Sequence, residues 1–365
     1  MHLFCVSDEF FSPHLLTLKK NWRNFAARWS PSLQSDLKTK NRMKQLVWLL
    51  TAFISMSILW GCVDKGRNDR NHFVHEPANA VYHWKTVYNP NAFEKDFLKK
   101  HQVKRMYLKF FDVGVDNLYD GRGDQPVPIA TTIFKDPIAN VGDVEIVPVV
   151  FITVEALRLD NPECPLAERI VERIDNMCWA NHIAYDEIQL DCDWTRETKG
   201  LFFDLCHKVR VLLQEKKKRL SSTIRLHQLR DTLPDIDYGV LMLYNTESLQ
   251  NPDVKNSILN SSVVKEYMRH VNSDKHLDFA YPTYEWTLWF KDRKLKGILP
   301  AGADTNVDGT LRHETSDYHE IIETKRAIRP ILKDIGYPSS TIIYHLDSAN
   351  LSKYSDHEIS EIYRP

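Results

Sequence analysis

The chain has 365 residues, which is long enough for one large domain or two ordinary ones. Its 48 Lys and Arg residues nearly balance 49 Asp and Glu residues, so no broad positive field attracts nucleic acid, and we expect no nucleic-acid partner. Glycine is scarce, at 12 residues, and the sequence contains no Walker-type loop and no GxGxxG run. These absences argue against the common phosphate-binding nucleotide sites.

The N-terminal part predicts a sorting signal. The segment 42–44, Arg-Met-Lys, precedes an apolar run, 46–59, that is short for a membrane span but suits a signal peptide. The run 59–62, Leu-Trp-Gly-Cys, resembles the lipobox of bacterial lipoproteins, although Trp60 is bulkier than the usual small residue. This resemblance implies lipidation at Cys62 and a lipid-anchored location in the bacterial cell envelope. The alternative is a short buried helix that contains a cysteine by chance.

This signal divides the chain into four segments. Residues 1–42 precede a signal peptide and lack periodicity, so we expect Met43 to be the true start and 1–42 to be an upstream extension. Residues 43–61 are the predicted signal peptide, and the polar residues 62–78 are the predicted tether. Residues 79–365 form the predicted single domain.

From residue 79 onward, strand patterns alternate with helix patterns. The predicted strands are Val81–Lys85, Arg105–Phe111, Glu145–Thr153, Glu187–Asp193, Ser222–His227, Tyr238–Tyr244, Leu277–Tyr281 and Thr341–Leu346. The clearest predicted helices are Asn91–His101, Pro165–Asn181, Thr198–Lys218, Ser262–Val271 and Asp317–Asp334. Eight strands alternating with helices predict an α/β fold, a (β/α)8 TIM barrel, with a doubly wound open sheet as the alternative. The long connections 115–143 and 282–317 are expected to be loops at the C-terminal end of the barrel.

Four cysteines remain after the predicted processing: Cys164, Cys178, Cys192 and Cys206. Export would place them in an oxidising compartment, where disulfides are allowed. Four cysteines permit three pairings, and the sequence does not choose among them.

The predicted strand 187–193 ends in two carboxylates. Side chains alternate along a strand, so Gln189, Asp191 and Asp193 share one face, and apolar residues occupy the other. Burying an unpaired carboxylate is costly or shifts its pKa strongly. The pattern therefore indicates either a structural ion pair, a solvated strand end, or a polar site at the mouth of the barrel.

Three segments resemble, in order, strand motifs of family 18 glycoside hydrolases. The segment 189–195, Gln-Leu-Asp-Cys-Asp-Trp-Thr, resembles the fourth-strand signature, 240–245 resembles the sixth-strand motif, and 280–284 resembles the seventh. A closer likeness is to bacterial exported barrels with domain of unknown function 3142. The resemblance implies carbohydrate processing, with hydrolysis of a glycosidic bond as the leading activity.

The resemblance assigns roles and also shows one departure. Asp191 and Asp193 match the two supporting aspartates of family 18, and Tyr244 matches the tyrosine that steadies the reacting group. Thr195 stands where the family has its proton-donating Glu, and a hydroxyl cannot replace that acid near neutral pH. Asp193 is therefore the candidate acid, and Glu285 is its first candidate partner. Two further candidate partners lie at strand ends, Glu155 and Asp347, and each of the three partners is otherwise a solvated loop acid.

Further candidate substrate-binding residues lie at or just past strand ends: Trp84, Trp194, His227, Tyr281 and Trp286. The tryptophans would stack on sugar rings or pack in the core, and His227, which shares a strand face with Arg225, would bind a substrate hydroxyl or be structural. Asp191 and Asp193 would suit a divalent cation, but no second cluster supports one, so we expect no metal and no cofactor.

The expected partner is a polysaccharide or oligosaccharide, and the expected state is a monomer. Because Thr195 replaces the family acid, the alternative function is a non-catalytic glycan-binding or structural envelope lipoprotein.

Overall fold

The computed structural model describes residues 76–117, 123–161, 165–271, 276–299, 306–335 and 339–364. The predicted upstream extension 1–42, the signal peptide 43–61, most of the tether 62–78, and Cys62 lie outside the described residues. The fold is that of the unit His72–Pro365. Among the described residues, no helix combines the length and the apolarity needed to span a membrane.

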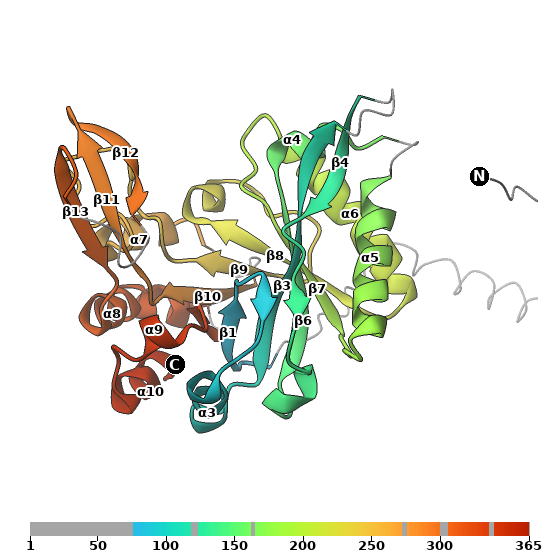
Figure 1. Cartoon of the computed structure of the whole chain (residues 1–365), viewed down its shortest axis with the longest axis horizontal. Coiled ribbons are helices and arrows are strands. Elements are labelled where there is room, and N and C mark those ends of the chain that lie inside the picture. The colour runs from blue at the N-terminus through green and yellow to red at the C-terminus, as the bar shows by residue number, and fades with distance from the viewer. Residues whose placement is uncertain are drawn as a thin grey trace, which may run out of the picture. The chain divides into compact units, whose positions relative to one another are not determined.

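Eight parallel strands close into a barrel (Figure 1). In barrel order they are β1 (Asn79–His83), β3 (Arg105–Asn117), β6 (Glu145–Ile152), β7 (Glu187–Asp191), β8 (Arg219–Arg225), β9 (Tyr238–Met242), β10 (Leu277–Pro282) and β14 (Thr341–Tyr344). The barrel closes because β1 pairs in parallel with both β3 and β14. Each predicted strand overlaps one of the eight, so the TIM barrel is confirmed and the open sheet is wrong.

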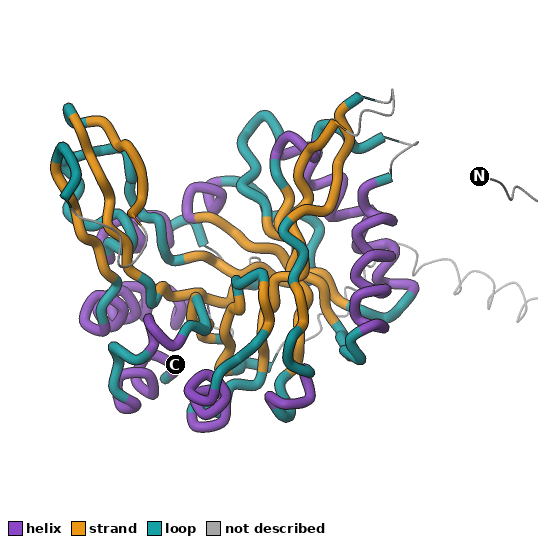
Figure 2. The backbone as a smooth tube through the Cα atoms, viewed as in Figure 1, coloured by secondary structure: helices purple, strands orange, loops and turns teal. Residues whose placement is uncertain are grey.

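Helices cover the outside of this barrel (Figure 2). Their bounds are α3 (Ala92–Lys100), α4 (Val154–Leu157), α5 (Leu166–Ala180), α6 (Lys199–Glu215), α7 (Ser261–Met268), α8 (Tyr318–Ile335), α9 (Ser348–Leu351) and α10 (Asp356–Tyr363). Helix α3 shows how the sequence sets these bounds. Asn91 and Glu94 form a capping box at its start, and two lysines occupy its last turn, where they complement the helix dipole.

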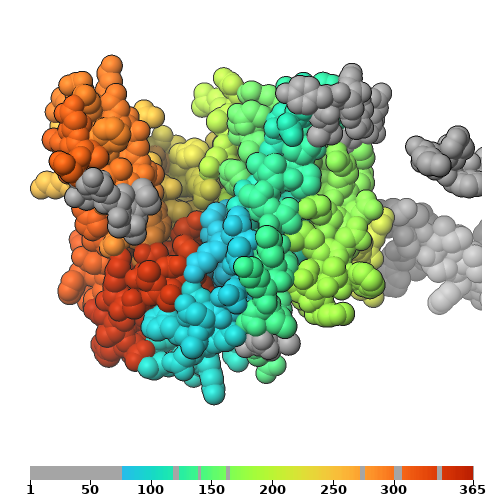
Figure 3. Space-filling view, viewed as in Figure 1, coloured from blue at the N-terminus to red at the C-terminus, as the bar shows by residue number. Residues whose placement is uncertain are grey.

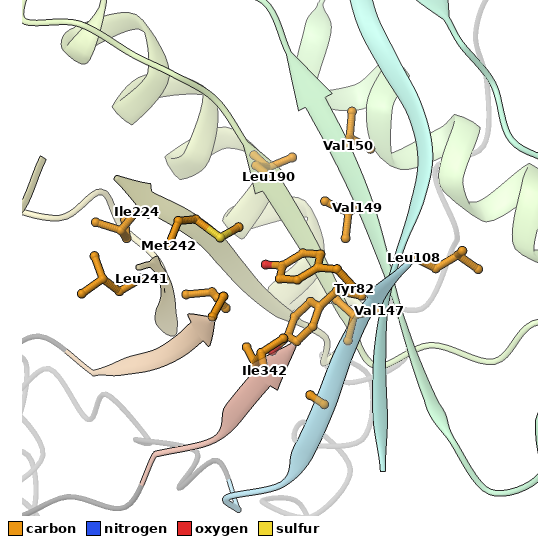
Figure 4. Packing of buried hydrophobic residues seen from close by; sticks show 14 of the residues in the cluster. Tyr82, Leu108, Val147, Val149, Val150, Leu190, Ile224, Leu241, Met242 and Ile342 are labelled. Carbon is orange, nitrogen blue, oxygen red and sulfur yellow. The ribbon is translucent and has the colours of Figure 1, made fainter. Parts of the chain in front are cut away.

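The barrel wall separates two kinds of packing. The outward side chains of the strands are apolar and are buried against the helices, whereas many inward positions are polar and hydrogen-bonded. Figure 4 shows buried apolar side chains on several barrel strands, among them Tyr82, Leu190 and Met242. Cys178, Cys192 and Cys206 are buried free thiols in this packing.

Two connections depart from the simple strand–helix alternation. Strand β3 continues to Asn117 and pairs with antiparallel β4 (Asp124–Ile129), followed by β5 (Ile133–Phe134) and the 3-10 helix η1 (Ile138–Val141), where the sequence predicted a loop. Strand β5 pairs in parallel with β2 (Val87–Tyr88). Among its described residues, the β3–β6 connection contains no α-helix.

The second departure follows β10. Strands β11 (Glu285–Lys291), β12 (Lys294–Leu299) and β13 (Thr310–Thr315) form an antiparallel sheet, the β11–β13 arm, where a loop was predicted. The connection from β8 to β9 contains only the 3-10 helix η2 (Leu226–Arg230) among regular elements. On the face shown in Figure 3, the surface is hollowed between the orange β11–β13 arm and the β3–β4 pair. The C-terminal ends of the barrel strands, here called the barrel mouth, lie between these two extensions (Figure 1).

Candidate functional site at the barrel mouth

The inward face of β7 carries a ladder of polar side chains. Tyr82 donates a hydrogen bond to Gln189 over 2.6 Å, and Gln189 donates to Ser221 over 3.2 Å. One step nearer the mouth, Asp191 accepts a hydrogen bond from Thr223. Gln189 and Asp191 therefore share the inner face, as the alternation of the strand predicted.

Arg225, the last residue of β8, joins the two aspartates. Its Nη2 lies 3.2 Å from Asp191 Oδ1, and its Nε contacts Asp193 Oδ1. Asp191 is only 3% exposed, whereas the side chain of Asp193 is 58% exposed. Arg225 thus links a buried carboxyl to one that faces solvent.

Burial is the main cause of a shift in the pKa of Asp191. It raises the pKa of Asp191 above its ordinary value, because a charged carboxylate is poorly solvated inside the barrel. Arg225 and the hydrogen bond from Thr223 oppose this shift, while Asp193 and Asp112 add to it. The nearby charge of Asp193 therefore contributes to the raised pKa of Asp191, but burial is the larger cause.

A second ion pair lies on β3, which is separated from β7 by β6. Lys109 Nζ is 2.8 Å from Asp112 Oδ2, and it also lies 5.7 Å from the centre of the Trp84 ring. The register between β3 and β6 shifts between Lys109 and Phe111, which marks a bulge in β3. The bulge lets residues three apart in the sequence meet on one side of the strand. Strand alternation alone did not find this pair.

Aromatic rings border these charges. Tyr344 is the centre of an aromatic cluster, with ring centroids 4.9 Å from Tyr244, 5.6 Å from Tyr82, 5.9 Å from Tyr284 and 6.1 Å from Trp84. The cluster continues from Tyr284 to Trp286, whose ring centroid lies 5.2 Å away. The aromatic cluster is defined as Tyr82, Trp84, Tyr244, Tyr284, Trp286 and Tyr344.

The aromatic cluster and the aspartates belong to one neighbourhood. Burial raises the pKa of Tyr244, and Asp191 adds to that shift while Arg225 opposes it. The Tyr244 hydroxyl donates to Met242 Sδ over 3.1 Å. The structure therefore brings together five predicted residues around Arg225 and Tyr344: Asp191, Asp193, Tyr244, Trp84 and, through Tyr284, Trp286.

His227 lies beside this group, in η2. It is exposed, and partial desolvation lowers its pKa below the ordinary value, with the Asp193 charge opposing that effect. Because His227 is exposed and lies near Asp193, it remains a candidate substrate-binding residue.

Two predicted substrate-binding residues lie elsewhere. Trp194 is 2% exposed, and its ring packs edge-on against Phe203 of α6 at 5.6 Å. Tyr281 is buried beneath Lys325 of α8, whose Nζ lies 5.3 Å from the ring centre. Both rings face the helices, so we do not include them in the candidate site.

The predicted partner acids of Asp193 are engaged with other groups or lie outside the barrel strands. Glu285 begins β11 and contacts Lys353 at 2.5 Å and His313 at 3.8 Å. Asp347 caps α9 and pairs with Lys85 at 2.9 Å. Glu155 is exposed in α4. None of these contacts is with Asp193, and the pairing of Asp193 with one of these acids stays a prediction.

Thr195 is exposed just beyond the aspartates. Its backbone N–H donates to Thr198 Oγ1 over 2.9 Å, which starts the turn that leads into α6. The part of the chain that the structure describes contains no group of three or more His, Cys, Asp or Glu side chains arranged to hold a metal ion. We therefore assign no metal ligands at the mouth.

Solved structures with the same fold include family 18 chitinases. A GH18 chitinase from Flavobacterium johnsoniae is 15% identical, with 79% of this chain and 94% of that chain covered and a TM-score of 0.50. A chitinase from Chromobacterium violaceum is 11% identical, with coverage of 79% and 98% and a TM-score of 0.52. A GH18 chitinase from Cycas revoluta in complex with (GlcNAc)3 is 10% identical, with coverage of 78% and 98% and a TM-score of 0.51. At these identities the likeness is one of fold.

No family model matches the chain, and no curated relative matches it. The resemblance to domain of unknown function 3142 and the loss of the family Glu at Thr195 therefore stay predictions. The barrel itself is the fold that these chitinases share with the chain.

Proposed function

We propose that this chain binds a carbohydrate at its barrel mouth. One observation carries the proposal: Arg225 and its two aspartates lie beside the aromatic cluster. Sugars present hydroxyl groups at their edges and apolar C–H faces, so they suit a site that combines charged hydrogen-bonding groups with aromatic rings. The chitinase barrels with this fold support the same class of ligand.

Hydrolysis of a glycosidic bond is the second candidate, and the exposure of Asp193 favours it. An exposed carboxylate beside a buried carboxyl with a raised pKa gives two acids in different environments, as glycosidases require. Asp193 is the exposed member of this pair and is therefore the carboxyl group that a substrate would contact, as acid, base or nucleophile. Because Asp191 is buried, it cannot reach a leaving group directly, and binding therefore ranks first.

A glycan screen with the purified protein tests both candidates. (GlcNAc)3 is a natural first probe because the Cycas revoluta chitinase was solved with it, and envelope polysaccharides follow. We expect binding, with Trp84→Ala weakening it about tenfold through lost ring contact. Chitin oligomers should be cleaved poorly, because Thr195 cannot donate the proton. A protein that binds no member of the screen would overturn the proposal.

Asp193→Asn separates binding from hydrolysis. If the wild type releases new reducing ends, this variant should lose about 10²–10⁴-fold in rate, while the matched surface variant Asp204→Asn keeps full rate. If the wild type binds a glycan and releases no reducing ends, the chain is a binding protein. Cleavage by Asp193→Asn at the wild-type rate would remove Asp193 from the reaction.

We further propose that the protein is a monomeric lipoprotein of the bacterial envelope. The Leu-Trp-Gly-Cys run at 59–62 supports lipidation at Cys62 and removal of the residues before it. Mass spectrometry of the native N-terminus should find an acylated Cys62, and Cys62→Ser should abolish acylation and membrane recovery. A native protein that begins at Met1 or Met43 would contradict the proposal.

A further inference from the structure

A cavity of about 480 Å³ lies between α5 and the β3–β4 pair, on the outer side of the barrel wall. Its walls come from α5 on one side and from β3, β4 and the β4–β5 segment on the other. Its apolar lining includes Phe111, Val113, Phe134, Leu166, Ile170 and Met177. The volume falls within the range of small-molecule sites, roughly 300–1,000 Å³.

The topology explains why this side of the barrel is open. In a regular (β/α)8 barrel, the helix that follows one strand packs beside the helix that follows the next. Here the β3–β6 connection supplies β4, β5 and η1 in the described residues, and no α-helix packs beside α5 at this place. The face of α5 marked by Leu166, Ile170, Arg173 and Met177, at three- and four-residue steps, therefore lines a cavity.

Arg173 places a positive charge in this apolar lining. Its guanidinium lies 5.0 Å from the centre of the Phe111 ring, and its Nη2 donates to Thr131 Oγ1 over 2.9 Å. Its Nε is buried and has no hydrogen-bond partner. No carboxylate in the described parts of the chain forms an ion pair with Arg173, although the exposed Glu172 lies at the rim of the cavity.

An uncompensated, partly buried cation is costly to a folded protein. The lowered pKa of Arg173 has burial as its cause and agrees with this environment. A bound anion would relieve the cost, and a guanidinium recognises a carboxylate through paired, charge-assisted hydrogen bonds. Arg169 at the same rim is already directed at the Pro126 carbonyl, 3.5 Å away.

We propose that this cavity binds a small monocarboxylate with an apolar body. The carboxylate pairs with Arg173, and the aliphatic or aromatic body packs against Phe111, Ile170 and Met177. The site is independent of the carbohydrate proposed at the barrel mouth, because the lining residues lie on the outer side of the barrel wall.

Decanoate and 4-phenylbutyrate are suitable probes, titrated into the full-length protein by calorimetry. Both should bind, and decyltrimethylammonium, which has an equally apolar chain and the opposite charge, should not. Arg173→Met keeps the apolar volume and removes the charge, and should weaken binding of both carboxylates about 10–100-fold, as expected for a hydrogen bond to a charged group. Glu172→Gln is the matched control at the rim, and it should bind them as well as or better than the wild type.

A second variant keeps the test informative if Arg173→Met fails to fold. Met177→Trp adds volume to the cavity without changing charge, and it should also abolish binding. Equal affinity of wild type and Arg173→Met for the carboxylates, or equal binding of decyltrimethylammonium, would overturn the proposal. Binding that survives Met177→Trp would place the ligand elsewhere and overturn it as well.

Discussion

At the scale of single residues, the barrel interior shows how charges are made compatible with burial. Arg225 pairs with Asp191 and Asp193, and Lys109 pairs with Asp112, so the carboxyl groups of Asp191 and Asp112 each have an opposite charge nearby. The sequence left a structural ion pair and a ligand site as alternatives for the two aspartates. The structure makes these alternatives compatible, because Asp191 is fixed inside the barrel while Asp193 remains open to a ligand.

His83 gives a prediction about acid stability. It is buried on β1, and its pKa is lowered from 6.5 to about 4, first by burial and then by the charges of Lys85 and His345. Between these two values the unfolded chain binds a proton that the folded chain does not bind. Stability should therefore be complete above pH 6.5 and should fall as the pH drops toward about 4.

The size of this effect is on the order of 3 kcal/mol in the free energy of unfolding. Urea unfolding of the wild type and of His83→Gln, measured at several pH values, should show a shallower pH dependence for the variant between pH 6.5 and 4. His357→Gln removes an exposed histidine on α10 and serves as the control, with the wild-type slope. The same slope in all three proteins would remove His83 as the cause.

At the scale of elements, one buried acid, Glu314, connects the β11–β13 arm to the segment that precedes α7. Glu314 of β13 accepts hydrogen bonds from Trp286 Nε1 over 2.7 Å and from the backbone N–H of Ser257 over 3.0 Å. Arg312 Nε lies 2.6 Å from the other carboxylate oxygen, as an ion pair without hydrogen-bond geometry. One side chain therefore connects β11, β13 and the segment before α7.

Glu314→Gln should loosen the arm. The variant leaves the half-buried Arg312 without its negative partner, and breaking a buried ion pair costs about 3–5 kcal/mol. Hydrogen exchange should become faster at the amides of β11 and β13 and stay unchanged in β7 and β8. Glu285→Gln, which breaks only a partly exposed pair with Lys353, should change exchange little. Uniformly faster exchange throughout the barrel would show that Glu314 acts on the whole fold.

The elements also show what a sequence can predict. The eight barrel strands and five helices were predictable because each carries a sustained apolar pattern, as in 146–152. The β11–β13 arm was not, because β12 alternates between exposed and half-buried positions and charged residues interrupt both β12 and β13. A weakly buried antiparallel sheet leaves little hydrophobic signal in the sequence.

The candidate site was predictable only in part, for a related reason. Asp191 and Tyr244 followed from strand alternation, since their strands are regular. Lys109 and Asp112 did not, because the bulge in β3 changes the alternation between them. A single charged residue within the otherwise apolar run 106–111 was the one available signal for Lys109. Tyr344 could be related to the site only once barrel closure placed β14 beside β1 and β10.

At the scale of the whole molecule, the last helix belongs to the structure that closes the barrel. Tyr363 of α10 donates to the Ala80 carbonyl of β1 over 3.1 Å. Lys325 of α8 donates to the carbonyls of Ile362 and Arg364 at the end of α10, where the helix dipole favours a cation. Burial lowers the pKa of Lys325 to about 8, so these carbonyls matter for keeping it charged and solvated. Tyr363 and Ala80, which are 283 positions apart in the sequence, are thus in direct contact.

A chain ending at Tyr354 should therefore lose the whole fold rather than only its last helix. The truncation removes the buried side chains of Ile359, Ile362 and Tyr363, and burying each large apolar side chain contributes about 1.5–3 kcal/mol. Their sum is comparable to the total stability of a typical domain, about 5–15 kcal/mol. Thermal unfolding followed by near-ultraviolet circular dichroism should show no cooperative transition. The control Asp356→Ala removes an exposed carboxylate that pairs with the exposed Lys100 and lies 3.5 Å from the buried His101, and it should unfold cooperatively near the wild-type temperature. A truncated chain that unfolds as cooperatively as the control would show that the barrel closes without α10.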